Sequence, residues 1–217
     1  LNPAGDEDRE LTAVSYSLFV EAGLGGGSSL VATLPYIRTG DDTKGLQDAS
    51  IWLKYLNLQN RKKRSLHNVF TAIGLSFPIS DYIVDDPAAI GQKATVFQGR
   101  LAYQLQHDDG WFISALSGID FQFAPDSRSS IPLLLRTGYG GPYFYVEGWF
   151  ELVRSLESGI AGQTAVAGTG SSWNRVGLTG YIPVFKWLGF TVGGAWITGG
   201  EFIGQSSRVN LGTVFKI

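Results

Sequence analysis

Few side chains in this sequence could perform catalysis, and their spacing does not favour it. A hydrolase would need a His-activated Ser or a similar nucleophile, only His67 and His107 are available, and no GxSxG, HExxH or P-loop pattern occurs. The run His107-Asp108-Asp109 is too compact to surround a metal ion with well-separated ligands. Because cysteine is absent, disulfides and thiolate metal sites are excluded as well. The sequence therefore predicts a protein that is not an enzyme and binds no cofactor.

Charged residues are scarce and lie within segments in which polar and apolar residues alternate. They make up 17% of the 217 residues, whereas a soluble globular domain has about a quarter. A period of two indicates strands with one charged and one apolar face. In a membrane barrel the charged face must look inward, because Arg or Lys facing lipid at the midplane costs roughly 2–4 kcal/mol. The predicted lumen-lining residues are the charged Glu21, Asp48, Lys54, Arg100, Asp120, Arg136, Glu147, Glu151 and Arg175 and the aromatic Phe19, Trp52, Phe70 and Trp149.

Two interpretations of these inward residues stay open at this point. In a channel the charges would shape the electric field at a constriction. They could instead pair across neighbouring strands and fill a barrel of modest size. The inward aromatic residues could likewise form a greasy path for an apolar solute or serve as packing.

The alternating segments predict about eleven strands of roughly ten residues or more. A tilted strand of about 9–11 residues crosses a bilayer, and strands of soluble proteins are about half as long. No run of 18 or more apolar residues occurs, which excludes a transmembrane helix. We therefore expect an all-β transmembrane, antiparallel up-and-down barrel that forms a single domain over residues 1–217. The predicted strands are 12–23, 28–38, 47–59, 66–78, 94–106, 111–124, 130–139, 142–155, 173–183, 187–198 and 207–217.

The connections between these strands alternate between short and long, as in outer-membrane barrels with periplasmic turns and extracellular loops. Single-chain bacterial barrels have even strand numbers. We therefore expect a barrel of about 12 strands, with one strand preceding Leu1 and residues 1–10 forming the first extracellular loop. The alternative is a miscounted strand.

Aromatic residues fall near both ends of the predicted strands, as interfacial belts do in such barrels. The girdle near the short turns is predicted to contain Tyr103, Trp111, Tyr139, Tyr143 and Trp187. The girdle near the long loops is predicted to contain Tyr36, Trp173 and Trp196.

Short motifs at several strand ends support a more specific assignment. They are Glu21-Ala22-Gly23-Leu24, Leu34-Pro35-Tyr36, Gly45-Leu46-Gln47-Asp48, Leu53-Lys54-Tyr55 and Gly74-Leu75-Ser76-Phe77-Pro78. The chain resembles, over roughly residues 10–155, the outer-membrane channel family of phenol-degradation (MetA-pathway) transporters. That family shows E-Y-G-L, L-P-Y, G-L-G-D, L-K-Y and G-x-K-L-P-T-G at these places. This chain departs from the pattern at Ala22, at Gln47 and at Ile79-Ser80.

The resemblance implies a 12-stranded barrel that takes up poorly soluble compounds such as aromatic hydrocarbons. We expect a passive outer-membrane channel for small hydrophobic molecules, with lipid, lipopolysaccharide and the solute as partners. The net charge of −2 does not favour nucleic acid. A structural or adhesion barrel with a blocked lumen is the alternative, and a soluble lipocalin-like binder is a third. The sequence leaves the oligomeric state open.

Three connections could carry further roles. Residues 156–172, rich in Gly, Ala, Ser and Thr, could fold inward as a gate or form an external loop. Residues 80–93 could capture apolar solutes or bind lipopolysaccharide through calcium. The basic run 61–64 is expected in a solvated periplasmic turn.

Overall fold

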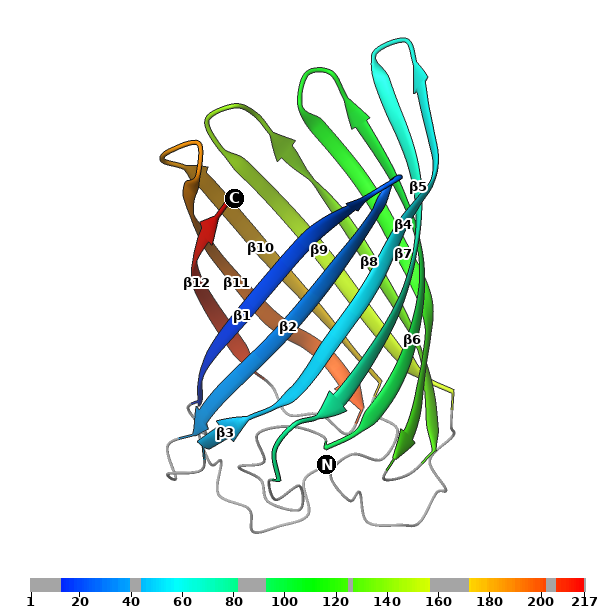
Figure 1. The fold of residues 1–217 in the computed structure, drawn as a ribbon, viewed down its shortest axis with the longest axis vertical. Coiled ribbons are helices and arrows are strands. Elements are labelled where there is room, and N and C mark those ends of the chain that lie inside the picture. The colour runs from blue at the N-terminus through cyan, green and yellow to red at the C-terminus, as the bar shows by residue number, and fades with distance from the viewer. Residues whose placement is uncertain are drawn as a thin grey trace.

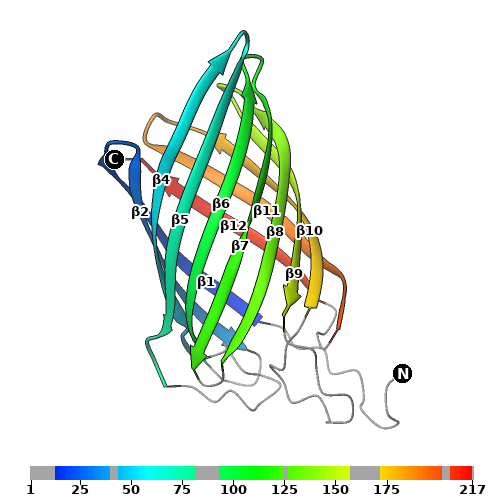
Figure 2. The same ribbon diagram turned by 90° about the vertical axis from the view of Figure 1, so that its right-hand side faces the viewer.

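The computed structural model describes residues 13–39, 44–81, 93–124, 127–156, 172–201 and 206–216. These residues form one antiparallel sheet that curls into a barrel wall (Figures 1 and 2). The sheet contains β1 (Ala13–Gly25), β2 (Ser28–Thr39), β3 (Lys44–Leu46), β4 (Asp48–Lys62), β5 (Ser65–Pro78), β6 (Thr95–His107), β7 (Trp111–Ala124), β8 (Arg128–Gly140), β9 (Tyr145–Ser155), β10 (Ser172–Pro183), β11 (Leu188–Glu201) and β12 (Ser207–Phe215). The all-β transmembrane barrel class predicted from the alternation is confirmed.

Sequence neighbours pair throughout the sheet, in the order β1-β2-β4-β5-β6-β7-β8-β9-β10-β11-β12. The three-residue strand β3 lies off this path and pairs with β2. Short turns gather at one end of the barrel, where the C-terminus also lies (Figure 1). Residues 40–43, 82–92, 125–126, 157–171 and 202–205, which join strands at the other end, lie outside the described part of the chain.

The strand boundaries differ from the prediction by up to three residues, and β9 and β4 are two of the larger shifts. β9 begins at Tyr145 rather than at residue 142. Pro142 cannot donate a ladder hydrogen bond, and Gly141 N–H instead donates to the Phe144 carbonyl across the turn. β4 extends to Lys62, so that the turn to β5 contains only Lys63 and Arg64.

β1 and β12 are the two edges of the sheet, and among the described residues each pairs with one neighbour. Ten antiparallel steps separate them, so they run in the same direction. A hydrogen-bonded closure by antiparallel pairing therefore needs one more strand between them, running the opposite way. The strand expected before Leu1 would meet this requirement, and it stays a prediction.

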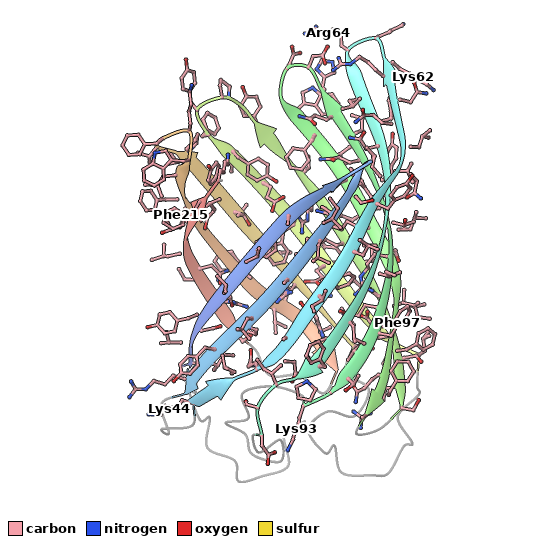
Figure 3. All side chains as sticks on the ribbon, in the orientation of Figure 1. Lys44, Lys62, Arg64, Lys93, Phe97 and Phe215 are labelled. Carbon is pink, nitrogen blue, oxygen red and sulfur yellow. The ribbon has the colours of Figure 1, made fainter. Side chains whose placement is uncertain are left out.

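The register divides the sheet into a crowded concave face and an open convex face. Apolar residues of the convex face are widely exposed, as in Leu101 (58%) and Ile113 (51%). Residues of the concave face are closely surrounded, as in Asn68 (6%) and Phe112 (6%). Figure 3 shows Phe97 and Phe215, which belong to the convex set, pointing away from the barrel. The described residues include no helix long and apolar enough to span a membrane.

Spin labels should distinguish the two faces at adjacent positions of one strand. A nitroxide at Ile113, on the convex face, should collide more often with oxygen, which concentrates in acyl chains. A nitroxide at Ser114, on the concave face, should collide more often with a water-soluble nickel chelate. The measurement is power-saturation electron paramagnetic resonance in lipid vesicles. Equal water accessibility at the two positions would contradict the membrane orientation.

Candidate functional site

The concave face collects every charged residue that the sequence predicted for the lumen. Following the paired residues from strand to strand places them all on this face. They are Glu21, Asp48, Lys54, Arg100, Asp120, Arg136, Glu147, Glu151 and Arg175. The concave face also carries Phe19, Trp52, Phe70 and Trp149. Their roles toward a solute stay predictions.

Eight of these charges form four ion pairs. Lys54 Nζ lies 2.6 Å from Glu21 Oε1, reaching across β2, and Ser29 also donates to that carboxylate. The guanidinium of Arg136 lies 3.8 Å from Glu147, which also accepts a hydrogen bond of 2.6 Å from the hydroxyl of Tyr145. The first pair joins β4 to β1 across β2, and the second joins the neighbouring strands β8 and β9 on the inner wall.

Of the two remaining pairs, Arg100–Asp120 is the best buried of all four. Arg175 Nε donates to Glu151 Oε2 at 2.8 Å. Arg100 Nη1 lies 2.7 Å from Asp120 Oδ1, with 11% and 18% of the two side chains exposed. The hydrogens of that nitrogen point to the carbonyls of Gly99 and Ile119, so Asp120 Oδ1 accepts no hydrogen bond from the described residues. Attraction between the charges holds this pair.

Three inner aromatic rings lie flat on glycines of a neighbouring strand. A Cβ built on Gly74 would fall 2.4 Å from the ring of Trp52, and one on Gly177 would fall 2.1 Å from Trp149. The ring of Tyr181 covers Gly189 in the same way. Only a residue without a side chain leaves room for a ring against the wall.

A cation lies over each of these rings. The guanidinium of Arg100 lies 5.2 Å from the centre of Trp52, and that of Arg175 lies 5.4 Å from Trp149. Lys216 Nζ lies 5.1 Å from the centre of Tyr181. Each unit is therefore a stack of glycine, aromatic ring and cation, held by cation–π attraction.

The register gives the face of each predicted girdle residue, and its place in a lipid belt stays a prediction. Tyr36, Tyr103, Trp111, Tyr139 and Trp196 lie on the convex face, and Tyr143 and Trp187 lie in turns at the short-turn end. Trp187 stacks between Phe185 and Phe215. Trp173 is the correction: it lies on the concave face, where its ring meets the Arg175 guanidinium at 4.9 Å. The pairing of Trp173 with Val153 sets this face.

The short-turn rim carries its own charge contacts. Arg61 Nη1 lies 2.8 Å from Asp108, and Arg64 pairs with Asp109, so the turns β4–β5 and β6–β7 are joined. His67 Nδ1 lies 2.7 Å from the Tyr103 hydroxyl. Residues 61–64, the basic run predicted to form a solvated turn, are exposed. Two of them, Arg61 and Arg64, form ion pairs with Asp108 and Asp109. The described residues contain no cluster of three or more His, Asp or Glu that could hold a metal ion.

Part of each remaining loop hypothesis falls outside the described residues. Residues 157–171, the proposed gate, are among these. Of the loop at 80–93, the described ends are joined by an ion pair between Asp81 and Lys93. The Lys93 ammonium lowers the pKa of the exposed Asp81 carboxyl below its ordinary value.

A hollow of about 760 Å³ lies at the short-turn end, over β9 to β11. Its walls include inner residues Tyr145, Tyr181 and Thr191 and the turn residue Phe185. The sequence analysis did not identify Tyr181 and Lys216 as residues of the inner wall, because the alternation of charged and apolar residues does not point to them. The available signal was the placement of Gly74, Gly177 and Gly189 one strand away from an inward aromatic residue.

Comparisons with known proteins agree with this architecture. Residues 11–194 match the family described as "Putative MetA-pathway of phenol degradation". The fold resembles the crystal structure of an outer membrane channel from Pseudomonas putida F1, with a TM-score of 0.65 and 15% sequence identity. The match covers 94% of this chain and 82% of that chain. At this identity the likeness establishes the fold alone. No curated protein matches the chain.

Replacing Arg100 by Met should lower the free energy of unfolding by about 1–3 kcal/mol, because a largely buried Asp120 loses its counter-charge. The double variant Arg100→Met/Asp120→Leu should recover most of this loss. The exposed turn pair is the control: Arg64→Met should cost less than about 0.5 kcal/mol. Urea unfolding in lipid vesicles, followed by tryptophan fluorescence, measures all three. Equal losses of unfolding free energy for Arg100→Met and Arg64→Met would contradict the conclusion that Arg100 neutralises a largely buried Asp120.

Replacing Gly177 by Ala should destabilise the barrel by roughly 1–3 kcal/mol, because the methyl group would fall 2.1 Å from the Trp149 ring and 2.7 Å from the Gly194 carbonyl oxygen. The matched control is Gly148→Ala, whose Cβ would meet Leu178 at an ordinary 3.5 Å. Near-ultraviolet circular dichroism reports the tryptophan environment, and urea unfolding reports stability. An unchanged spectrum and stability for Gly177→Ala would show that the ring does not rest there.

Proposed function

Since this chain belongs to the MetA-pathway phenol-degradation family, we propose that it is an outer-membrane channel for passive uptake of small neutral hydrophobic molecules, phenol-like compounds among them. The barrel would span the outer membrane with its short turns in the periplasm. Lipid and lipopolysaccharide would contact its convex face, and the solute would pass along its concave face. In this proposal the protein transports solutes passively, and His67 and His107 have no catalytic role.

The pairing of the inner charges is the observation that carries this proposal. Four cations, Lys54, Arg100, Arg136 and Arg175, each lie against one carboxylate. Those carboxylates belong to Glu21, Asp120, Glu147 and Glu151, so these eight charges sum to zero. Asp48 and Arg208 lie on the same face outside these pairs, and Lys216 lies over the ring of Tyr181. Rings of one charge sign select ions in ion-selective channels. A wall of cancelling pairs produces little net field along the axis and suits a solute without charge.

A structural barrel with a blocked lumen is the second candidate, and the same pairing supports it. Ion pairs that bridge neighbouring strands also fill interior space and stiffen a wall. The two candidates differ in one measurable property, since only a channel conducts ions and solutes.

Planar bilayer recordings should separate the candidates and test the charge argument together. The purified protein should conduct, with a reversal potential close to zero under a KCl gradient, because the lumen favours neither ion. Glu151→Gln leaves Arg175 without its counter-charge and should shift the reversal potential toward that of chloride.

The control is Asp108→Asn, a carboxylate change on the exposed rim, which should leave ion selectivity nearly unchanged. Absence of any conductance would favour the blocked barrel. Strong selectivity of the unmodified protein for either ion would refute the neutral-wall argument.

A further inference from the structure

One row of apolar side chains crosses the concave face at consecutive paired positions. Leu56 pairs with Phe70, Phe70 with Ala102, Ala102 with Leu116, and Leu116 with Leu134. We call these five residues, on β4 to β8, the apolar row. They lie in the continuous wall away from the β1 and β12 edges (Figure 2).

The apolar row is unusual for its face, because its neighbours there are mainly polar. All five residues are half-buried, so part of each side chain is open to the lumen. Four steps between strands of about 4.8 Å make the row roughly 19 Å long. Paired residues lie perpendicular to strands that are themselves tilted, so the row runs obliquely along the lumen (Figure 1). The apolar row therefore extends along the barrel axis as well as around the wall.

A row of neutral polar side chains lies directly beside it. Gln59 pairs with Asn68, Asn68 with Gln104, and Gln104 with Ser114. We call these four residues the amide row. Beyond Ser114 the same register reaches Arg136, which lies 3.8 Å from Glu147. The Gln59 amide donates to Asn68 Oδ1 at 3.1 Å, and Asn68 is 6% exposed. Amides and hydroxyls offer both donors and acceptors without charge.

The other flank of the apolar row offers a solute little to bind. Lys54 and Arg100 lie there, joined through Ala72. Both cations already contact carboxylates, those of Glu21 and Asp120. A carboxylate solute would lose hydration without gaining a counter-charge from this flank, which costs free energy.

We propose that the solute crosses the lumen along the apolar row, with its apolar body on that row and one neutral polar edge against the amide row. This inference rests on the channel function proposed above. It assigns the preferred substrate class as compact neutral molecules that carry a single hydroxyl or carbonyl group. Carboxylates of the same size are disfavoured.

This path differs from a slide made of the inward aromatic residues. Trp52 and Trp149 are each covered by a guanidinium, so a solute at these positions would meet a cation rather than a bare ring. Of the four inward aromatic residues, Phe70 alone belongs to the apolar row.

Block of the ionic current by phenol in planar bilayers tests the path, because a solute in the lumen displaces ions. Leu116→Asn should raise the half-blocking phenol concentration roughly three- to tenfold through lost apolar contact. Leu116→Asn/Leu134→Asn should raise it further. The matched control is Thr191→Asn, a polar change on the concave face of β11, which should leave phenol block unchanged. Benzoate should block the unmodified channel less than phenol at equal concentration.

The outcomes separate the two proposals. An unmodified protein without conductance would overturn the channel function and this inference with it. A conducting protein whose phenol block is unaffected by Leu116→Asn, or equally affected by Thr191→Asn, would overturn the path alone. Open-channel conductance of each variant verifies that it folds and inserts, and Leu116→Thr replaces any variant that does not.

Discussion

The constraint on which this structure depends is that no backbone N–H or C=O can stay unpaired in lipid. Strands can meet it only in long, continuous ladders that lead around a barrel, and among the described residues every long strand except the edge strands β1 and β12 pairs on both sides. Pairing fixes which residues share a face, because successive side chains point to opposite sides. Once the convex face is given to lipid, every charged residue of a strand interior must lie on the concave face. The inner ion pairs are thus a consequence of the backbone requirement.

Crowding on the concave face creates a second requirement, which glycine meets. Curvature brings inner side chains together, and large rings would otherwise project into the lumen. At Gly74, Gly177 and Gly189 the wall lacks a side chain, and a ring from the adjacent strand occupies that space. Arg100, Arg175 and Lys216 then cover the rings. Such stacks keep aromatic bulk against the wall and place cations where carboxylates of neighbouring strands can reach them.

Strand number and facing could be predicted from the sequence because both follow from a period of two that depends on local residues alone. The partners of the charges could not. Lys54 reaches Glu21 across an intervening strand, a contact set by the register of three strands. The position of Trp173 near a strand end predicted a place in the lipid belt. Trp173 and Arg175 are two residues apart on one strand, however, so both lie on the inner face. Alternation, when it conflicts with position along the strand, is the stronger signal.

A lumen with a polar wall can still favour apolar solutes, and the arrangement of the two rows suggests how. Water over the apolar row has few hydrogen-bond partners on the wall side, so its displacement by an apolar body is favourable. Contact occurs on one side of the solute only, which limits the area removed from water and hence the affinity. Weak binding at successive positions is what conduction needs, since a solute must leave as readily as it enters. A fully apolar lumen would hold such a solute too tightly, whereas a row one residue wide, bordered by amides and by neutralised charges, would let it move on.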